Sequence, residues 1–82
     1  MKDVLKVLGY RLRETRQARN LSQENLAVLS GIHRTYVSSV ECGRRNVSIL
    51  TLTRIAHALG VTTAFLLTSH TRVKSPKKPG NG

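Results

Sequence analysis

The segment from Ser22 to Glu41 constrains the fold more than any other part of the chain. Within it, Ala27, Gly31, Val37 and Val40 are spaced as two short helices joined by a sharp turn require. A small side chain at position 27 lets the next helix cross closely, and glycine tolerates the positive φ of a tight turn. The two valines, three positions apart, give the second helix an inward side. The segment therefore predicts two crossing helices.

The second of these helices is expected to begin near His33 and end near Cys42. Away from its valines it carries small, polar and basic side chains, most of them near its start. The major groove of DNA admits an α-helix and exposes hydrogen-bonding base edges to such side chains. Two short helices in this arrangement form a helix-turn-helix unit, in which the second helix enters the groove. The pattern therefore indicates DNA binding.

The rest of the chain supplies further helices around this unit. Residues 4–19 form an amphipathic pattern, with Leu5, Leu8 and Leu12 on one side. Gly9 interrupts it at a cost of about 1 kcal/mol. The glycine marks either a close helix contact or a ragged beginning of the helix.

Capping residues indicate where the later helices begin and end. Ser22 is a typical N-cap, and helix two is expected to run to Ser30 with its apolar residues inward. These inward residues are Leu26, Ala27 and Leu29. Gly43 suits the end of the third helix, and Ser48 the start of a fourth that extends to Gly60. Thr62 or Thr63 caps a short fifth helix through Leu67.

The charge of the chain favours a polyphosphate partner. Its formal net charge is +10, and residues 1–70 alone carry ten basic against four acidic side chains. We expect residues 1–69 to form one domain and residues 70–82, which are basic and have nothing to bury, to form a disordered tail. With a lone cysteine, Cys42, no intramolecular disulfide is possible, and apolar stretches are too short for a membrane span. A soluble cytoplasmic protein is expected.

Enzymatic chemistry is not indicated by the sequence. His33, His57 and His70 are too scattered for a metal site, and no nucleophile-base pair or phosphate-binding glycine loop is present. We therefore expect no cofactor, no metal, no catalytic residue and no small-molecule ligand.

Residues 5–67 resemble the Cro/repressor-type helix-turn-helix family, the five-helix domain of lambdoid phage repressors. The resemblance lies in Leu21-Ser22-Gln23-Glu24, Leu26-Ala27, Gly31, Val40-Glu41-x-Gly43 and the segment from Ile55 to Val61. It implies an all-α, compact five-helix fold. Within the family, the segments 33–41 and 44–48 look most similar to controller proteins of restriction-modification systems. One departure is Cys42, which leaves a thiol near the expected DNA face.

The resemblance, together with side-chain chemistry, assigns expected DNA contacts. The guanidinium of Arg34 fits the O6/N7 edge of guanine, although a phosphate contact or a solvated charge is the alternative. Tyr36 is expected at the DNA interface, where it senses base-step geometry, or else packed on its own helix. The residues expected to read bases are Arg34, Thr35, Tyr36, Ser38 and Ser39. Those expected to contact the DNA backbone are Ser22, Gln23, His33, Arg44, Arg45 and Asn46.

The resemblance also implies two structural features. In similar repressors an arginine late in the first helix pairs with the glutamate closing the third, which here predicts an ion pair between Arg16 and Glu41. Part of the remaining apolar surface is expected to form a two-fold dimer interface, made by Ile49, Leu50, Leu66 and Leu67. For Phe65 we expect an ordinary core position instead.

The sequence thus predicts a sequence-specific transcriptional regulator that binds pseudo-palindromic double-stranded DNA operators as a homodimer. A restriction-modification controller protein that regulates its own gene is the favoured form. The alternatives are a phage-type repressor, or an antitoxin that masks a toxin and autoregulates its operon. Activation would require an exposed patch that contacts RNA polymerase, which the sequence does not identify.

Overall fold

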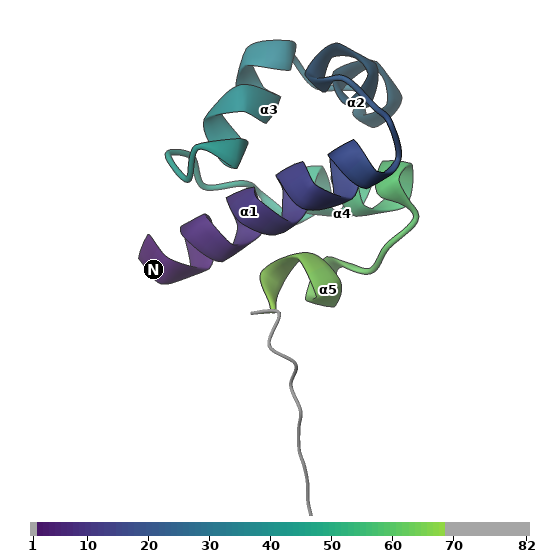
Figure 1. Cartoon of the computed structure of the whole chain (residues 1–82). Coiled ribbons are helices and arrows are strands. Elements are labelled where there is room, and N and C mark those ends of the chain that lie inside the picture. Colours follow the sequence, from purple (N-terminus) through teal and green to yellow (C-terminus); the bar gives the residue numbers. More distant parts are fainter. Residues whose placement is uncertain (1, 69–82) are drawn as a thin grey trace, which may run out of the picture.

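The computed structural model describes residues 2–68, and the predicted tail of residues 70–82 lies outside them. Five helices follow one another along the chain (Figure 1). They are α1 (Lys2–Ala18), α2 (Gln23–Ser30), α3 (Arg34–Glu41), α4 (Ile49–Leu59) and α5 (Thr63–Leu67). Within residues 2–68 there is no strand, and the predicted all-α five-helix fold is confirmed. None of these helices is long and apolar enough to cross a membrane.

Side-chain caps fix where the later helices begin. Ser22, Ser48 and Thr62 each accept a hydrogen bond from a backbone N–H in the first turn of the helix that follows. Thr62, rather than Thr63, is therefore the cap of α5. Gly31, at the end of α2, has a φ of +71°, the left-handed conformation that the turn into α3 requires. Local sequence chemistry accounts for these boundaries.

The hydrophobic core lies where all five helices meet. Its fully buried large side chains are Leu8, Leu12, Leu26, Val37, Val40, Ile55, Leu59 and Leu66. The prediction that Leu29 points inward is wrong, because this side chain is 59% exposed. In the eight-residue helix α2, Leu26, Ala27 and Ser30 already cover the side that faces the core, and Leu29 lies off that side.

Gly9 marks a close contact between α1 and α3, and the helix is not ragged before it, because α1 already begins at Lys2. A Cβ atom built on Gly9 would lie 2.6 Å from the carbonyl oxygens of both Val40 and Glu41. No ordinary side chain fits at that distance, so α1 approaches the end of α3 as closely as backbone atoms permit. The glycine thereby helps to set the position of α3.

Candidate nucleic-acid interface

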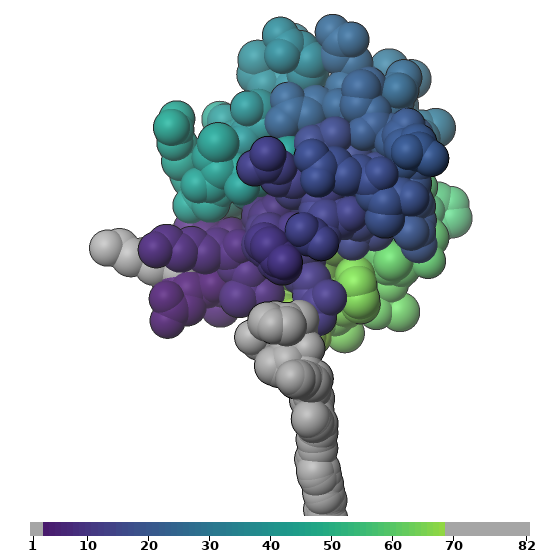
Figure 2. Space-filling view, in the orientation of Figure 1, coloured from purple at the N-terminus to yellow at the C-terminus, as the bar shows by residue number. Residues whose placement is uncertain are grey.

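Helix α3 has two sides of opposite character. Val37 and Val40 are completely or almost completely buried against the core. Arg34 and Thr35, in the first turn, are exposed, whereas Ser38 and Ser39 are half-buried. In Figure 2, α2 and α3 gather at one end of the molecule and project from it. A partner that approaches this end meets small and basic side chains on α3.

Arg34 is held loosely at the beginning of α3. Its Nε lies 3.7 Å from Oε2 of Glu24, which stands in the first turn of α2. The two side chains are 52% and 76% exposed, respectively, so water competes with this contact. The guanidinium therefore keeps donors for an incoming partner. The sequence alone does not place Glu24 at this surface, because the pair forms across two helices.

Tyr36 links α3 to the loop that follows it. Its ring is partly buried against the core, and its hydroxyl donates a hydrogen bond to the carbonyl oxygen of Asn46 at 3.4 Å. The guanidinium carbon of Arg45 lies 4.7 Å from the centre of the ring, a cation–π distance. Arg44, Arg45 and Asn46 are exposed beside it. Tyr36 thus joins α3 to a loop that carries two exposed arginines.

Two side chains that are expected to contact the DNA backbone, those of Ser22 and His33, cap helices in the structure. Oγ of Ser22 accepts a hydrogen bond from the backbone N–H of Asn25 at 2.9 Å. Nδ1 of His33 accepts one from the backbone N–H of Thr35 at 3.2 Å and lies 2.8 Å from the Thr35 hydroxyl. The remaining free N–H groups at both helix starts can still meet an anion.

Behind this surface lies a buried polar network that joins α1, α2 and α3. Nε of Arg16 contacts Oε2 of Glu41 at 2.6 Å, and Nη2 contacts Oε1 at 3.1 Å. Nη1 of the same arginine donates to the carbonyl oxygen of Leu21, and Nε2 of Gln23 donates to Oε1 of Glu41 at 3.0 Å. The two charged side chains are only 11% and 5% exposed. The side-chain amide of Gln23 therefore already donates one hydrogen bond within the protein.

The apolar residues expected at a dimer interface divide into two groups. Ile49 is 84% exposed, Leu50 60% and Leu67 41%, so all three are accessible to a partner. The prediction that Leu66 belongs to this interface is wrong, because its side chain is 0% exposed and packs in the core. Phe65, expected as ordinary core, is instead 37% exposed.

Metal binding is not supported in the part of the chain that is described. Between residues 2 and 68, no three side chains of His, Cys, Asp or Glu are grouped as a metal ion requires. Cys42, at the C-terminal end of α3, is an exposed free thiol.

Comparison with known proteins gives consistent matches over the described helices. Residues 12–66 match the profile of a helix-turn-helix family. The control protein C.SmaI of Serratia marcescens is 47% identical over 66 residues, covering 80% of this chain and 79% of that protein.

Solved structures agree with this match. The restriction-modification controller protein C.AhdI from Aeromonas hydrophila has a TM-score of 0.73 and 50% sequence identity, over 76% of this chain and 94% of that one. SinR, a master regulator for biofilm formation solved in complex with DNA, has a TM-score of 0.72 and 31% identity. That match covers 74% of this chain and 98% of the chain in that structure.

Proposed function

Because this chain belongs to the helix-turn-helix family, whose members are DNA-binding regulators and not enzymes, we propose that it controls transcription by sequence-specific binding to an operator. The controller type is supported by its similarity to C.SmaI and C.AhdI. We further propose that it binds as a homodimer in the cytoplasm and regulates its own gene.

The observation that carries this proposal is the contrast between the two sides of α3. On its inner side, Val37 and Val40 are buried and Glu41 is bound by both Arg16 and Gln23. On its outer side, Arg34 and Thr35 are exposed at the helix start. A helix whose inner side is fixed in the core, and whose outer side keeps exposed hydrogen-bond donors, is suited to reading base edges in a major groove.

The side chains divide into two roles. We propose that Arg34, Thr35 and Tyr36 read bases, assisted by Ser38 and Ser39, whose small size lets the helix lie deep in the groove. Arg44, Arg45 and Asn46 would contact the sugar-phosphate backbone and fix the register. Gln23 and His33 lie at helix starts, so their backbone N–H groups, and the remaining amide atoms of Gln23, would bind phosphate. The backbone N–H of Ser22 is already bonded to Asn25, so Ser22 would contact phosphate through its hydroxyl.

A dimer would place two copies of α3 in successive major grooves. The exposed apolar side chains of Ile49, Leu50 and Leu67 support a two-fold interface, because a partner subunit would remove their apolar surface from water. Half-sites about 34 Å apart, one turn of DNA, follow from that symmetry. Occupancy of the promoter would then depend on protein concentration, and activation would require a contact with RNA polymerase.

Footprinting on the DNA upstream of the protein's own gene tests this proposal. We expect two protected segments, centred about ten base pairs apart, that appear together as the protein concentration rises. A scrambled fragment of equal length and composition is the control. Protection of both fragments at the same concentration, at near-physiological ionic strength, would show binding without sequence preference and would refute the proposal.

A further inference from the structure

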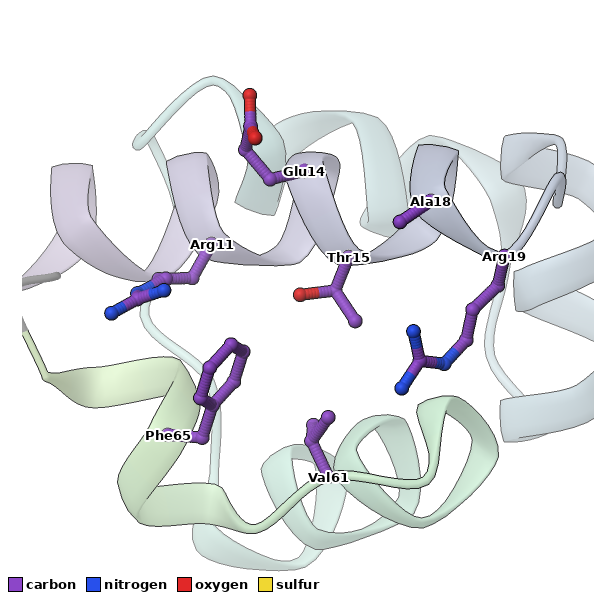
Figure 3. Close-up of a pocket in the computed structure, with 7 residues that line it drawn as sticks. All are labelled: Arg11, Glu14, Thr15, Ala18, Arg19, Val61 and Phe65. Atoms are coloured by element: carbon purple, nitrogen blue, oxygen red, sulfur yellow. The ribbon is translucent and has the colours of Figure 1, made fainter.

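A small pocket lies between α1 and the segment that leads from α4 into α5 (Figure 3). Its volume is about 250 Å³. Thr15 of α1 faces the pocket, and Val61 and Phe65 provide its apolar side, while Arg11 and Arg19 stand at its two ends. The pocket thus combines an apolar wall with two basic groups.

Both arginines are held in place by the protein backbone. Nε of Arg19 donates a hydrogen bond to the carbonyl oxygen of Leu59 at 2.6 Å. Nε of Arg11 donates to the carbonyl oxygen of Thr68 at 3.1 Å, and its guanidinium lies 4.4 Å from the centre of the Phe65 ring. Each guanidinium is therefore oriented through one N–H, which leaves the terminal Nη donors for another acceptor.

Neither arginine has a carboxylate partner within 4.0 Å among residues 2–68, whose ion pairs are Arg16–Glu41 and Arg34–Glu24. Glu14 also borders the pocket, but its carboxylate points away from both guanidinium groups in Figure 3. Two oriented positive groups without an internal counter-ion form a site with a charge deficit, which an external carboxylate can fill.

The pocket remains accessible when DNA is bound as proposed above. Helix α1 lies between α3 and α5, so the pocket and the basic surface of α3 are on different sides of α1 (Figure 1). Ile49 and Leu50 begin α4, whereas the pocket adjoins the end of that helix near Leu59. Leu67, the third residue proposed at the dimer surface, lies on α5 with Phe65 but does not line the pocket.

We propose that this pocket binds an acidic segment of a partner protein. A carboxylate would accept hydrogen bonds from the Nη groups of Arg11 or Arg19, and an apolar side chain next to it would pack on Val61 and Phe65. The apolar wall favours a protein segment, which can place an alkyl side chain beside a carboxylate, over a nucleic-acid backbone, whose carbons belong to oxygen-bearing sugars. This interaction goes beyond the proposed function and does not depend on it.

A nuclear magnetic resonance titration of the full chain tests the proposal. The probe is a blocked peptide of alternating glutamate and leucine, and the matched control peptide carries glutamine at every glutamate. We expect saturable shifts at the amides of Arg19, Val61 and Phe65 with the acidic peptide only. Arg19→Gln and Arg11→Gln should each weaken binding roughly fivefold, because an oriented charge-assisted hydrogen bond is lost.

Arg13→Gln is the matched control variant, since Arg13 is exposed on α1, lies outside the pocket and carries the same charge. Equal weakening by this variant would overturn the proposal, because general charge attraction would then explain binding. Shifts confined to α2 and α3 would overturn it as well, as would the same shifts produced by raising the protein concentration alone, which would indicate a second copy of the chain. Because the shifts are mapped on the unmodified protein, this part of the test does not depend on whether any variant folds.

Discussion

Two arginine–carboxylate pairs lie near the ends of α3 and differ in almost every respect. Arg16 and Glu41 meet at 2.6 Å with side chains 11% and 5% exposed, and two further hydrogen bonds complete their network. Arg34 and Glu24 stand 3.7 Å apart with side chains 52% and 76% exposed. The first pair fixes the helix within the fold, whereas the second leaves its arginine free to exchange a carboxylate for a base or a phosphate.

The comparison shows that burial determines what an arginine–carboxylate pair does in the protein. A charge removed from water must keep its partner, because an unpaired buried charge costs several kcal/mol. A pair in water contributes about 0–1 kcal/mol and is easily replaced. The C-terminal end of α3, which carries Glu41, therefore fixes the helix in the fold, and its exposed side remains available for contacts with a partner. Each of the following predictions tests this division.

The largest effect is expected from Glu41→Ala. It leaves the Arg16 guanidinium buried without a counter-ion and should lower the free energy of unfolding by about 3–5 kcal/mol. A domain of this size has a total stability on the order of 3–10 kcal/mol, so much of it is lost. Urea unfolding followed by circular dichroism measures the change. The matched control is Glu24→Ala, the same truncation in the exposed pair, which should cost less than about 1 kcal/mol. Unchanged stability and DNA affinity in Glu41→Ala would remove the structural role of the buried pair.

Gly9→Ala tests the close contact between α1 and the C-terminal end of α3. Glycine-to-alanine in a helix interior normally stabilises by about 1 kcal/mol. Here the new Cβ would meet two backbone carbonyl oxygens at 2.6 Å, and we expect a loss of about 1–3 kcal/mol instead. Thermal unfolding gives the sign. Gln17→Ala, at an exposed position of α1, is the control and should leave the melting temperature nearly unchanged or slightly raised. A stabilised Gly9→Ala protein would mean that α1 and α3 are not closely packed.

Arg45→Ala tests the exposed region, where function should change without stability. The guanidinium lies over the Tyr36 ring and is expected to contact phosphate. We expect roughly fivefold weaker binding to every DNA sequence, and a decrease of about one in the salt slope of the binding constant. Fluorescence anisotropy over a series of salt concentrations measures both quantities, with Arg13→Ala as the control of equal charge. A loss on only one sequence would instead assign base reading to this side chain.

The smallest effect is expected from Glu24→Gln. Removing this carboxylate relieves repulsion of phosphates near Arg34 and should raise the affinity for non-specific DNA on the order of twofold. Stability should change by less than about 0.5 kcal/mol. Glu14→Gln changes the net charge equally on α1 and serves as the control. If both variants gain the same affinity, the position of Glu24 beside Arg34 has no special importance.

Much of the fold could be predicted because its signals are local. The caps at Ser22, Ser48 and Thr62 and the left-handed glycine at Gly31 depend on neighbours within a few residues. The direction of single apolar residues was less predictable. In the run Phe65-Leu66-Leu67, the packing of α5 on α1 and α4 decides that the middle residue is buried.

The candidate site was predictable in outline but not in its connections. The exposure of Arg34 on α3 followed from helix periodicity. The stacking of Arg45 on Tyr36, and the hydrogen bond from Arg19 to Leu59, join residues brought together only by the tertiary fold. The resemblance to repressors suggested the Arg16–Glu41 pair. It gave no indication that Gln23 also donates to that glutamate.

We propose that the outer side of α3 distinguishes one DNA sequence from another through Arg34. The most direct test of this proposal compares the unmodified protein and Arg34→Ala on the operator and on operators changed at single base pairs. We expect Arg34→Ala to lose about 1–3 kcal/mol of binding free energy on the operator, and almost none on the operator already changed at the base pair that Arg34 contacts. Equal losses on every operator would show that Arg34 contacts only the DNA backbone and does not read a base.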